Sequence, residues 1–318
     1  MAFQYKIESY KNDISYINVT NGNKLEVELC NFGAGMRLIH FDGEPILLEP
    51  SRNDFPYLPD YYGKTLCRVA GRIKCHGVLN GKEYNLAETK SDYCLHGGDI
   101  NSQSYKIWSY KIKEFVKKLQ VIFTIKSKAK ELGFPGNLRM QVIYEIYENN
   151  VIKIIYKGST SSATLLSMSN HNYYNFFNSY NLSDYKLKIN ASQVSMVDDS
   201  LFIIGTKNVD EFYDFRKFHK LSSKLNHFEK TSIGTIDFTY IFDNIIKTKP
   251  QIEIKNDKLK MSVYTDYPSA NIYVDNALKN INYNNELNNY ANYYSNPGSW
   301  NAGLNIGFLL FNEWFIER

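Results

Sequence analysis

The chain has 318 residues, of which 43% are hydrophobic and 22% are charged, proportions that are typical of a globular protein with a sizeable core. Its formal net charge is +4 and no long basic run occurs, so the composition does not indicate nucleic-acid binding. No apolar stretch approaches the roughly 18 residues of a membrane span, which argues against membrane insertion. The opening MAFQYKIESYK lacks the basic and then apolar pattern of a signal peptide.

The four cysteines are Cys30, Cys67, Cys75 and Cys94, and no two of them form a CxxC pair. Together with the absent signal peptide, their irregular spacing predicts reduced thiols in a cytoplasmic protein. The same spacing gives no ligand set for a metal ion.

The dominant pattern along the chain is alternation of apolar and polar residues with a period of two, which predicts β-strands. The strands are expected at 25–30, 121–126, 142–147, 151–156, 187–189, 252–254 and 259–263. Asn149 and Asn150 separate two of them, and Asn tolerates the positive φ of a tight turn, so 142–156 is predicted to be a hairpin.

Helical periodicity is scarce, and only 217–229 is predicted to form a short helix. The asparagine-rich stretch 280–296 is interpreted as a solvated loop. Many strands with short turns and no proline-rich linker predict one all-β domain over 1–318, a large antiparallel β-sandwich.

Three polar positions stand out from this background. His96 lies in Leu95-His96-Gly97-Gly98, where two glycines permit a close approach of the backbone. His171 lies in the polar and aromatic segment 169–176, and Arg72 is flanked by apolar residues. Two histidines with carboxylates could form a zinc site, but the HxH and HExxH spacings are absent, so no metal is expected. A structural histidine remains the usual alternative at either position.

A series of short motifs resembles the aldose 1-epimerase family, in the family's order. They are Asn31-Phe32-Gly33-Ala34 (NYGA), 63–73 (GxTVGRxANRI), Leu95-His96-Gly97-Gly98 (LHGG), Gly133-Phe134-Pro135-Gly136 (GYPG), 170–176 (NHTYFNL), Asp214-Phe215-Arg216, Asp237 in Ile236-Asp237-Phe238 (DH) and 264–276 (TxxP…YxxN). Each motif is short, but their number and order make the resemblance specific.

The resemblance implies a galactose mutarotase-like supersandwich that interconverts the α and β anomers of a free monosaccharide without a cofactor. It implies His171 as general acid, in the imidazolium form, and a glutamate as general base. Arg72, His96, Asn170 and Asp237 would bind the sugar.

The base is expected at Glu286, because Pro297 and Gly307 then fall at the family's NxP and PGE positions and a final strand ends near Arg318. In the competing alignment Phe311 stands at the glutamate position and Glu313 is the nearest carboxylate.

Three departures from the family pattern affect the predicted sugar cleft: Gly71, Thr89 and Tyr93 stand where the family commonly has asparagine. They bear on substrate preference rather than on reaction type. Two alternatives stay open, a hexose-phosphate 1-epimerase and a non-catalytic carbohydrate-binding protein on the same fold. The chain is expected to act as a monomer or homodimer.

Overall fold

The structure is a computed structural model that describes residues 3–58, 61–89, 92–178, 182, 184–274, 304–308 and 312–317. The expected loop 280–296, Glu286 and Phe311 lie outside the described residues.

The largest sheet of the described residues is a nine-stranded antiparallel sheet, which contains strands from both halves of the chain. Its order is β11 (Ser109–Glu114), β12 (Lys118–Ser127), β13 (Leu138–Tyr147), β14 (Val151–Thr160), β26 (Asn312–Glu317), β23 (Lys260–Thr265), β22 (Ile252–Lys255), β17 (Lys186–Ile189) and β20 (His219–Lys220). The C-terminal strand β26 pairs with β14 and β23, and so joins the two halves of this sheet.

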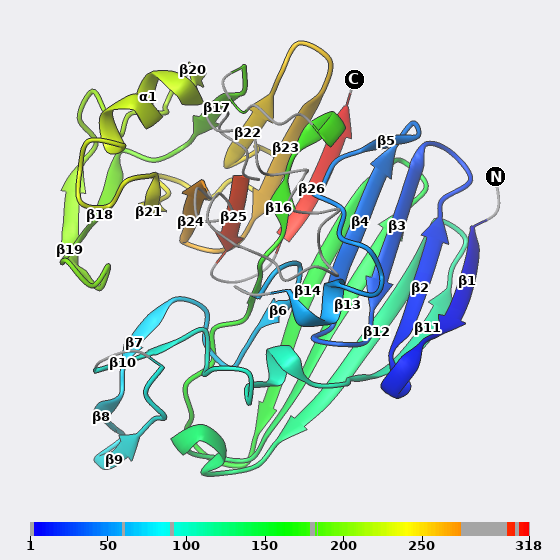
Figure 1. Ribbon diagram of the computed structural model, residues 1–318, viewed down its shortest axis with the longest axis horizontal. Coiled ribbons are helices and arrows are strands. Elements are labelled where there is room, and N and C mark those ends of the chain that lie inside the picture. The colour runs from blue at the N-terminus through cyan, green and yellow to red at the C-terminus, as the bar shows by residue number, and fades with distance from the viewer. Residues whose placement is uncertain are drawn as a thin grey trace, which may run out of the picture.

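Two further sheets complete the sandwich. The five-stranded sheet has the order β1 (Gln4–Ser9), β2 (Ser15–Thr20), β3 (Leu25–Cys30), β4 (Gly35–Phe41) and β5 (Glu44–Pro45). The six-stranded sheet has the order β16 (Tyr173–Tyr174), β25 (Leu304–Phe308), β24 (Ser269–Val274), β21 (Asp237–Ile241), β18 (Gln193–Val197) and β19 (Ile203–Asn208). In Figure 1 the five-stranded sheet, in blue, lies in front of β11–β14.

One hydrophobic core joins these layers because alternate strand residues point to the same face. Val27 of β3, Val121 of β12 and Val142 of β13 are all fully buried in the same cluster as Ile254 of β22 and Ile272 of β24. The period-two pattern of the sequence is therefore the pattern of the core, and the all-β sandwich expected from it is confirmed.

The predicted local elements are confirmed with small shifts at their ends. The hairpin is formed by β13 and β14, and Asn150 in its turn has φ 64°. The expected helix is shorter than predicted: α1 spans Leu221–Phe228 and buries Leu221, Leu225 and Phe228. No helix within the described ranges has the length and apolar character needed to cross a membrane.

Short ribbons and turns connect the sheets around the site. The ribbons pair β7 (Arg72–Lys74) with β10 (Tyr93–Leu95), β6 (Thr65–Leu66) with β15 (Ser169–Asn170), and β8 (His76–Leu79) with β9 (Lys82–Asn85). The 3₁₀ helices of the described chain are Lys11–Asp13, Phe55–Tyr57, Gln103–Tyr105, Glu131–Gly133 and Phe176–Asn178. The ribbons β7–β10 and β6–β15 carry the histidine and arginine motifs.

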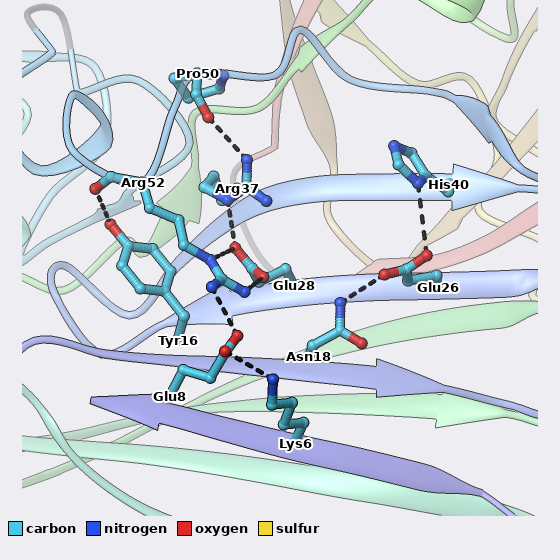
Figure 2. A network of polar contacts seen from close by, with 10 residues as sticks. All are labelled: Lys6, Glu8, Tyr16, Asn18, Glu26, Glu28, Arg37, His40, Pro50 and Arg52. Atoms are coloured by element: carbon cyan, nitrogen blue, oxygen red, sulfur yellow. Dashed lines mark hydrogen bonds and ion pairs between the residues drawn. The ribbon is translucent and has the colours of Figure 1, made fainter. Parts of the chain in front are cut away.

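A network of charges covers the outer face of the five-stranded sheet (Figure 2). Glu28 is buried, and although burial alone would raise its pKa, hydrogen bonds from Arg52 and Arg37 outweigh burial and lower it. Arg37 also donates to the carbonyl oxygen of Pro50 at 2.8 Å, and Arg52 pairs with Glu8 at 2.6 Å. The network thus holds the segment 50–52 against the sheet, a few residues before the histidine and arginine motifs begin.

All four cysteines are free and buried. Burial raises the pKa of Cys30, Cys67 and Cys94 to about 12 in each case. These thiols are protonated at neutral pH and lie within the packed interior.

Candidate active site

His96 follows directly after β10, whose last residue Leu95 pairs with Arg72 of β7. Its backbone has φ 51°, and Gly97 next to it has φ 79°. A Cβ on Gly97 would lie 2.4 Å from the carbonyl oxygen of Cys67, so only glycine fits there. The close backbone approach predicted from the two glycines is therefore present.

The backbone of Gly71 fixes the protonation of His96. The Gly71 N–H donates to Nδ1 of His96 at 3.0 Å, and the His96 N–H donates to the Gly71 carbonyl oxygen at 2.9 Å. Burial, with the nearby His171 and Arg72, lowers the pKa of His96 well below 6.5. Because Nδ1 accepts a hydrogen bond, the proton of the neutral ring resides on Nε2, which is a donor at every physiological pH.

His171 lies between β15 and β16 and meets His96 in space. The two ring centroids are 5.4 Å apart with the planes at 87°, and the ring of Tyr173 is 5.1 Å from His171. The His171 backbone is anchored at both ends: its N–H donates to Lys64 O and its carbonyl accepts from Gly63 N–H, each at 2.9 Å. Two motifs distant in sequence thus form one pair of imidazoles.

The protonation of His171 differs from the expected imidazolium. Burial, and secondarily the ammonium of Lys64, lowers the pKa of His171 to about 4. That ammonium is itself buried, and it donates to the carbonyl oxygens of Phe55 and Leu58 at 3.2 and 3.3 Å. With the described residues around it His171 is therefore a neutral imidazole at pH 7, and the imidazolium that the resemblance implies requires an opposite charge facing the ring.

Both histidines open into a cavity of about 560 Å³ whose lining also includes Tyr61, Arg72, Asp237 and Asn271. Arg72 Nη1 lies 3.9 Å from Asp237 Oδ2 across this cavity, beyond hydrogen-bond distance. The Nε atom of Arg72 is buried and has no hydrogen-bond partner within the described part of the chain. The cavity thus combines a cation, a carboxylate and two imidazoles, the groups that bind sugar hydroxyls.

The two arginines of the 63–73 motif have separate roles. Arg68 is fully buried and makes hydrogen bonds to Ser127 Oγ, to the carbonyl oxygens of Lys128, Pro135 and Gly136, and to Thr164 Oγ1, at 2.8–3.2 Å. It fastens the 133–136 turn to the fold. Arg72, four residues later, is the one that reaches the cavity.

The structure separates the other sequence-predicted positions. Asn170, expected to bind the sugar, is fully buried and does not line the cavity, and its amide makes no hydrogen bond to the described residues. Thr89 closes the β7–β10 ribbon: its hydroxyl accepts from Leu95 N–H at 2.7 Å and donates to Tyr93 O at 3.1 Å. The Arg72 guanidinium lies 6.0 Å from the centroid of the Tyr93 ring. Of the three departures from the family pattern, only Gly71 lines the cavity.

The expected base, Glu286, lies outside the described residues. Gly307 does not form the expected turn, because it lies within β25 opposite Asn271. A final strand, β26, follows it and places Glu313 opposite Lys153 and Tyr264. The argument for Glu286 over the Phe311 alignment therefore no longer includes a turn at Gly307. The expected strand near the C-terminus is present.

Tyr61, Thr239 and Asn271 are among the cavity residues that sequence reasoning missed. Tyr61 packs edge-on against His96 at 4.8 Å between ring centroids, and its hydroxyl donates to the Gly98 carbonyl. Thr239 lies two residues after Asp237 on one strand, so the period of two could have placed it on the same face. In the described segments, no three His, Cys, Asp or Glu side chains cluster as metal ligands would.

Comparison with known proteins connects this cavity to a family. A family model described as aldose 1-epimerase matches residues 15–300. The aldose 1-epimerase of Streptococcus thermophilus is 30% identical over 215 residues, 64% of this chain and 62% of that protein. Human galactose mutarotase is 28% identical over 225 residues, 69% of this chain and 63% of that protein. The matched stretch thus spans somewhat less than two thirds of the length of these relatives.

Solved structures show the same fold. A galactose 1-epimerase from Lactobacillus acidophilus superposes with a TM-score of 0.85 at 20% identity, covering 100% of this chain and 99% of that one. A GalM/aldose epimerase homologue from C. elegans superposes with a TM-score of 0.77 at 19% identity, with the same coverage.

Proposed function

The chain belongs to the aldose 1-epimerase family, and we propose that it interconverts the α and β anomers of a free aldose of the galactose or glucose type. The observation that carries the proposal is the cavity in which His96 and His171 face each other within reach of Arg72 and Asp237. The proposal also places the protein in the cytoplasm, as a monomer or homodimer.

Mutarotation requires two coupled proton movements. A base removes the proton of the anomeric hydroxyl while an acid protonates the ring oxygen, so that the C1–O5 bond breaks and an open-chain aldehyde forms. Rotation about C1–C2 exposes the other face of the aldehyde, and the same groups then close the ring in reversed roles. Each positioned acid or base contributes ~10²–10⁴-fold.

His171 is the proposed acid and Glu286 the proposed base. A pKa of about 4 leaves His171 neutral in the buried cavity. A carboxylate facing it would raise that pKa, because an opposite charge favours the imidazolium. The acid and the base of this proposal are therefore coupled: the ionised base keeps a proton on His171 near neutral pH.

The remaining groups bind and orient the sugar. His96 presents its Nε2–H as a fixed donor to an oxygen of the ring or a hydroxyl, since Gly71 occupies Nδ1. Arg72 donates to hydroxyl oxygens, and Asp237 accepts from hydroxyl protons. Such contacts hold the C1–O5 unit against the acid and base, which lowers the entropic part of the barrier.

Two alternatives are weaker. A hexose-phosphate 1-epimerase requires several cations for the phosphate, and Arg72 is the single Lys or Arg among the described residues that line the cavity. A non-catalytic sugar-binding protein would result if no carboxylate faces His171.

Polarimetry on freshly dissolved α-galactose and α-glucose tests the proposal. The purified chain should accelerate the approach to the equilibrium rotation in a manner proportional to its concentration, and His171→Asn should remove that acceleration. A wild-type chain that binds galactose but leaves the spontaneous rate unchanged would favour the non-catalytic alternative. Acceleration limited to hexose phosphates would favour the phosphate enzyme.

A further inference from the structure

The face of the six-stranded sheet beneath the cavity places four side chains in register. In the pairing of β21 with β24, Asp237 stands opposite Tyr273 and Thr239 stands opposite Asn271. Residues two apart on a strand point to the same face, so all four project toward the cavity, whose lining includes each of them.

A chain of hydrogen bonds runs through three of these residues to the carboxylate. The Thr239 hydroxyl donates to Asn271 Oδ1 at 3.0 Å, and Asn271 Nδ2 donates to Asp237 Oδ1 at 3.0 Å. The Oδ1 atom of Asn271 thus accepts from Thr239, and this fixes the amide so that its Nδ2 group points toward Asp237. This orientation is the only one in which the amide satisfies both partners, since an ionised carboxylate only accepts.

The chain begins where two strands separate. The pairing of β18 with β21 ends at Val194 and Tyr240, and the next amide, Thr239 N–H, donates to the Ser195 hydroxyl at 3.0 Å. The Ser195 side chain thereby satisfies a buried backbone donor at the end of this ladder. It fixes the backbone of Thr239, from which the hydrogen-bond chain starts.

The consequence lies at the other carboxylate oxygen. Asp237 Oδ2 stays 3.9 Å from Arg72 Nη1, at the outer limit of an ion pair and beyond the distance of a direct hydrogen bond. With Oδ1 held by Asn271, the carboxylate does not turn to close on the guanidinium. A hydroxyl oxygen about 2.8 Å from both atoms would lie beside the line that joins them, where it would donate to Asp237 and accept from Arg72.

From this geometry, and resting on the proposed function, we propose that Thr239 and Asn271 are positioning residues that keep Asp237 and Arg72 apart as a preformed receptor for a sugar hydroxyl. Neither residue takes part in proton transfer. Their contribution is to affinity, because a preorganised carboxylate does not have to break a direct hydrogen bond to Arg72 before it binds.

The test compares Thr239→Val, which removes the hydroxyl at nearly constant shape, with Thr239→Ser, which keeps it. Thr239→Val should raise both KM in polarimetry and the calorimetric Kd for galactose by about three- to tenfold, the range expected for one lost hydrogen bond, with kcat within twofold. Thr239→Ser should stay within about twofold of wild type for all three quantities. Thr124→Val, a strand threonine of β12 that accepts a hydrogen bond from Gln141 Nε2, reports what the same change does outside the cavity.

Asn271→Leu removes both hydrogen bonds of the amide and should raise Kd further than Thr239→Val. The proposal is overturned if Thr239→Val binds galactose as wild type does, if Thr239→Ser is as weak as Thr239→Val, or if kcat falls while KM holds. The Kd is measured without turnover, so a failure of the proposed function can be told apart from a failure of this inference. If the wild type shows no mutarotase activity but Thr239→Val still binds galactose more weakly than Thr239→Ser, the positioning role is supported and the proposed function is not. A wild type that neither binds nor turns over galactose overturns both proposals.

Discussion

The imidazoles of His96 and His171 meet edge to face, with ring centroids 5.4 Å apart and planes at 87°. One ring follows strand β10 and the other precedes strand β16, so the contact exists only because the β7–β10 and β6–β15 ribbons converge. Burial lowers the pKa of both rings, and this contact contributes for His96. The pair is a neutral, partly desolvated centre whose protonation depends on what faces it.

Glu286→Gln tests the assignment of the base. The glutamine keeps the shape but cannot take a proton, so kcat should fall by roughly 10²–10⁴-fold with KM little changed. His171→Asn should do the same, and the double variant should be scarcely slower than either single one, because groups that act as a unit are not additive.

Glu313→Gln is the matched control for that assignment, since Glu313 is the nearest carboxylate in the competing alignment. The turnover of Glu313→Gln should stay close to that of the wild type when the change in optical rotation is followed by polarimetry. Loss of turnover in Glu313→Gln, with Glu286→Gln near normal, would transfer the role of base to Glu313.

Asp237→Asn should act on binding rather than on chemistry. The amide cannot accept from a sugar hydroxyl as strongly as the carboxylate, and hydrogen bonds to a charged group contribute about 1.5–3 kcal/mol, so KM should rise about tenfold or more. Initial rates over a range of galactose concentrations separate KM from kcat. A collapse of kcat at constant KM would instead place Asp237 in the transition state.

Arg68 and Arg72 should fail in different ways when each is changed to methionine. Arg68→Met removes the guanidinium donor from the carbonyl oxygens of Pro135 and Gly136, and the free energy of unfolding should drop by about 2–5 kcal/mol with a lower Tm. Arg72→Met should leave Tm near wild type and raise KM. Equal losses of Tm in the two variants would contradict this division.

Acid should destabilise the fold partly through His171. Its folded pKa of about 4 lies below the ordinary value of 6.5, so between these values the unfolded chain binds more protons and the free energy of unfolding falls as pH falls. The full shift corresponds to about 3 kcal/mol, and an ionised base facing the ring would reduce this contribution. Urea denaturation at pH 7 and pH 4.5 should show a smaller acid-induced loss in His171→Asn than in wild type; an unchanged loss would exclude this contribution.

The buried thiols should be inert in the native protein. Burial raises the pKa of Cys67 to about 12, so little thiolate exists at pH 8 to react with an alkylating reagent. Mass spectrometry should find no more than traces of modification before unfolding and four modified thiols in denaturant. Fast native labelling, or loss of activity on treatment with a chelator, would contradict the structural role assigned to these cysteines.

The sequence by itself determined the fold class and the main elements. Alternation with a period of two is a local property that burial on one face of a strand imposes, so strands such as β3, β13, β14 and β22 could be placed from the sequence. The motifs around His96, His171 and Arg72 likewise predicted residues that line the cavity, because glycines and runs of polar residues mark places where the backbone and a ligand approach closely.

Only the tertiary structure decided what depends on long-range packing. It distinguished Arg68, whose guanidinium donates to carbonyl and hydroxyl oxygens of the fold, from Arg72 in the cavity, although only four positions separate these two arginines of one motif. It buries His171 and thereby lowers the pKa of its imidazole, since a pKa follows from the surroundings and not from the residue type. The chain from Thr239 through Asn271 to Asp237 exists because β21 and β24 pair in one register, and pairing between distant strands has no signature in local sequence.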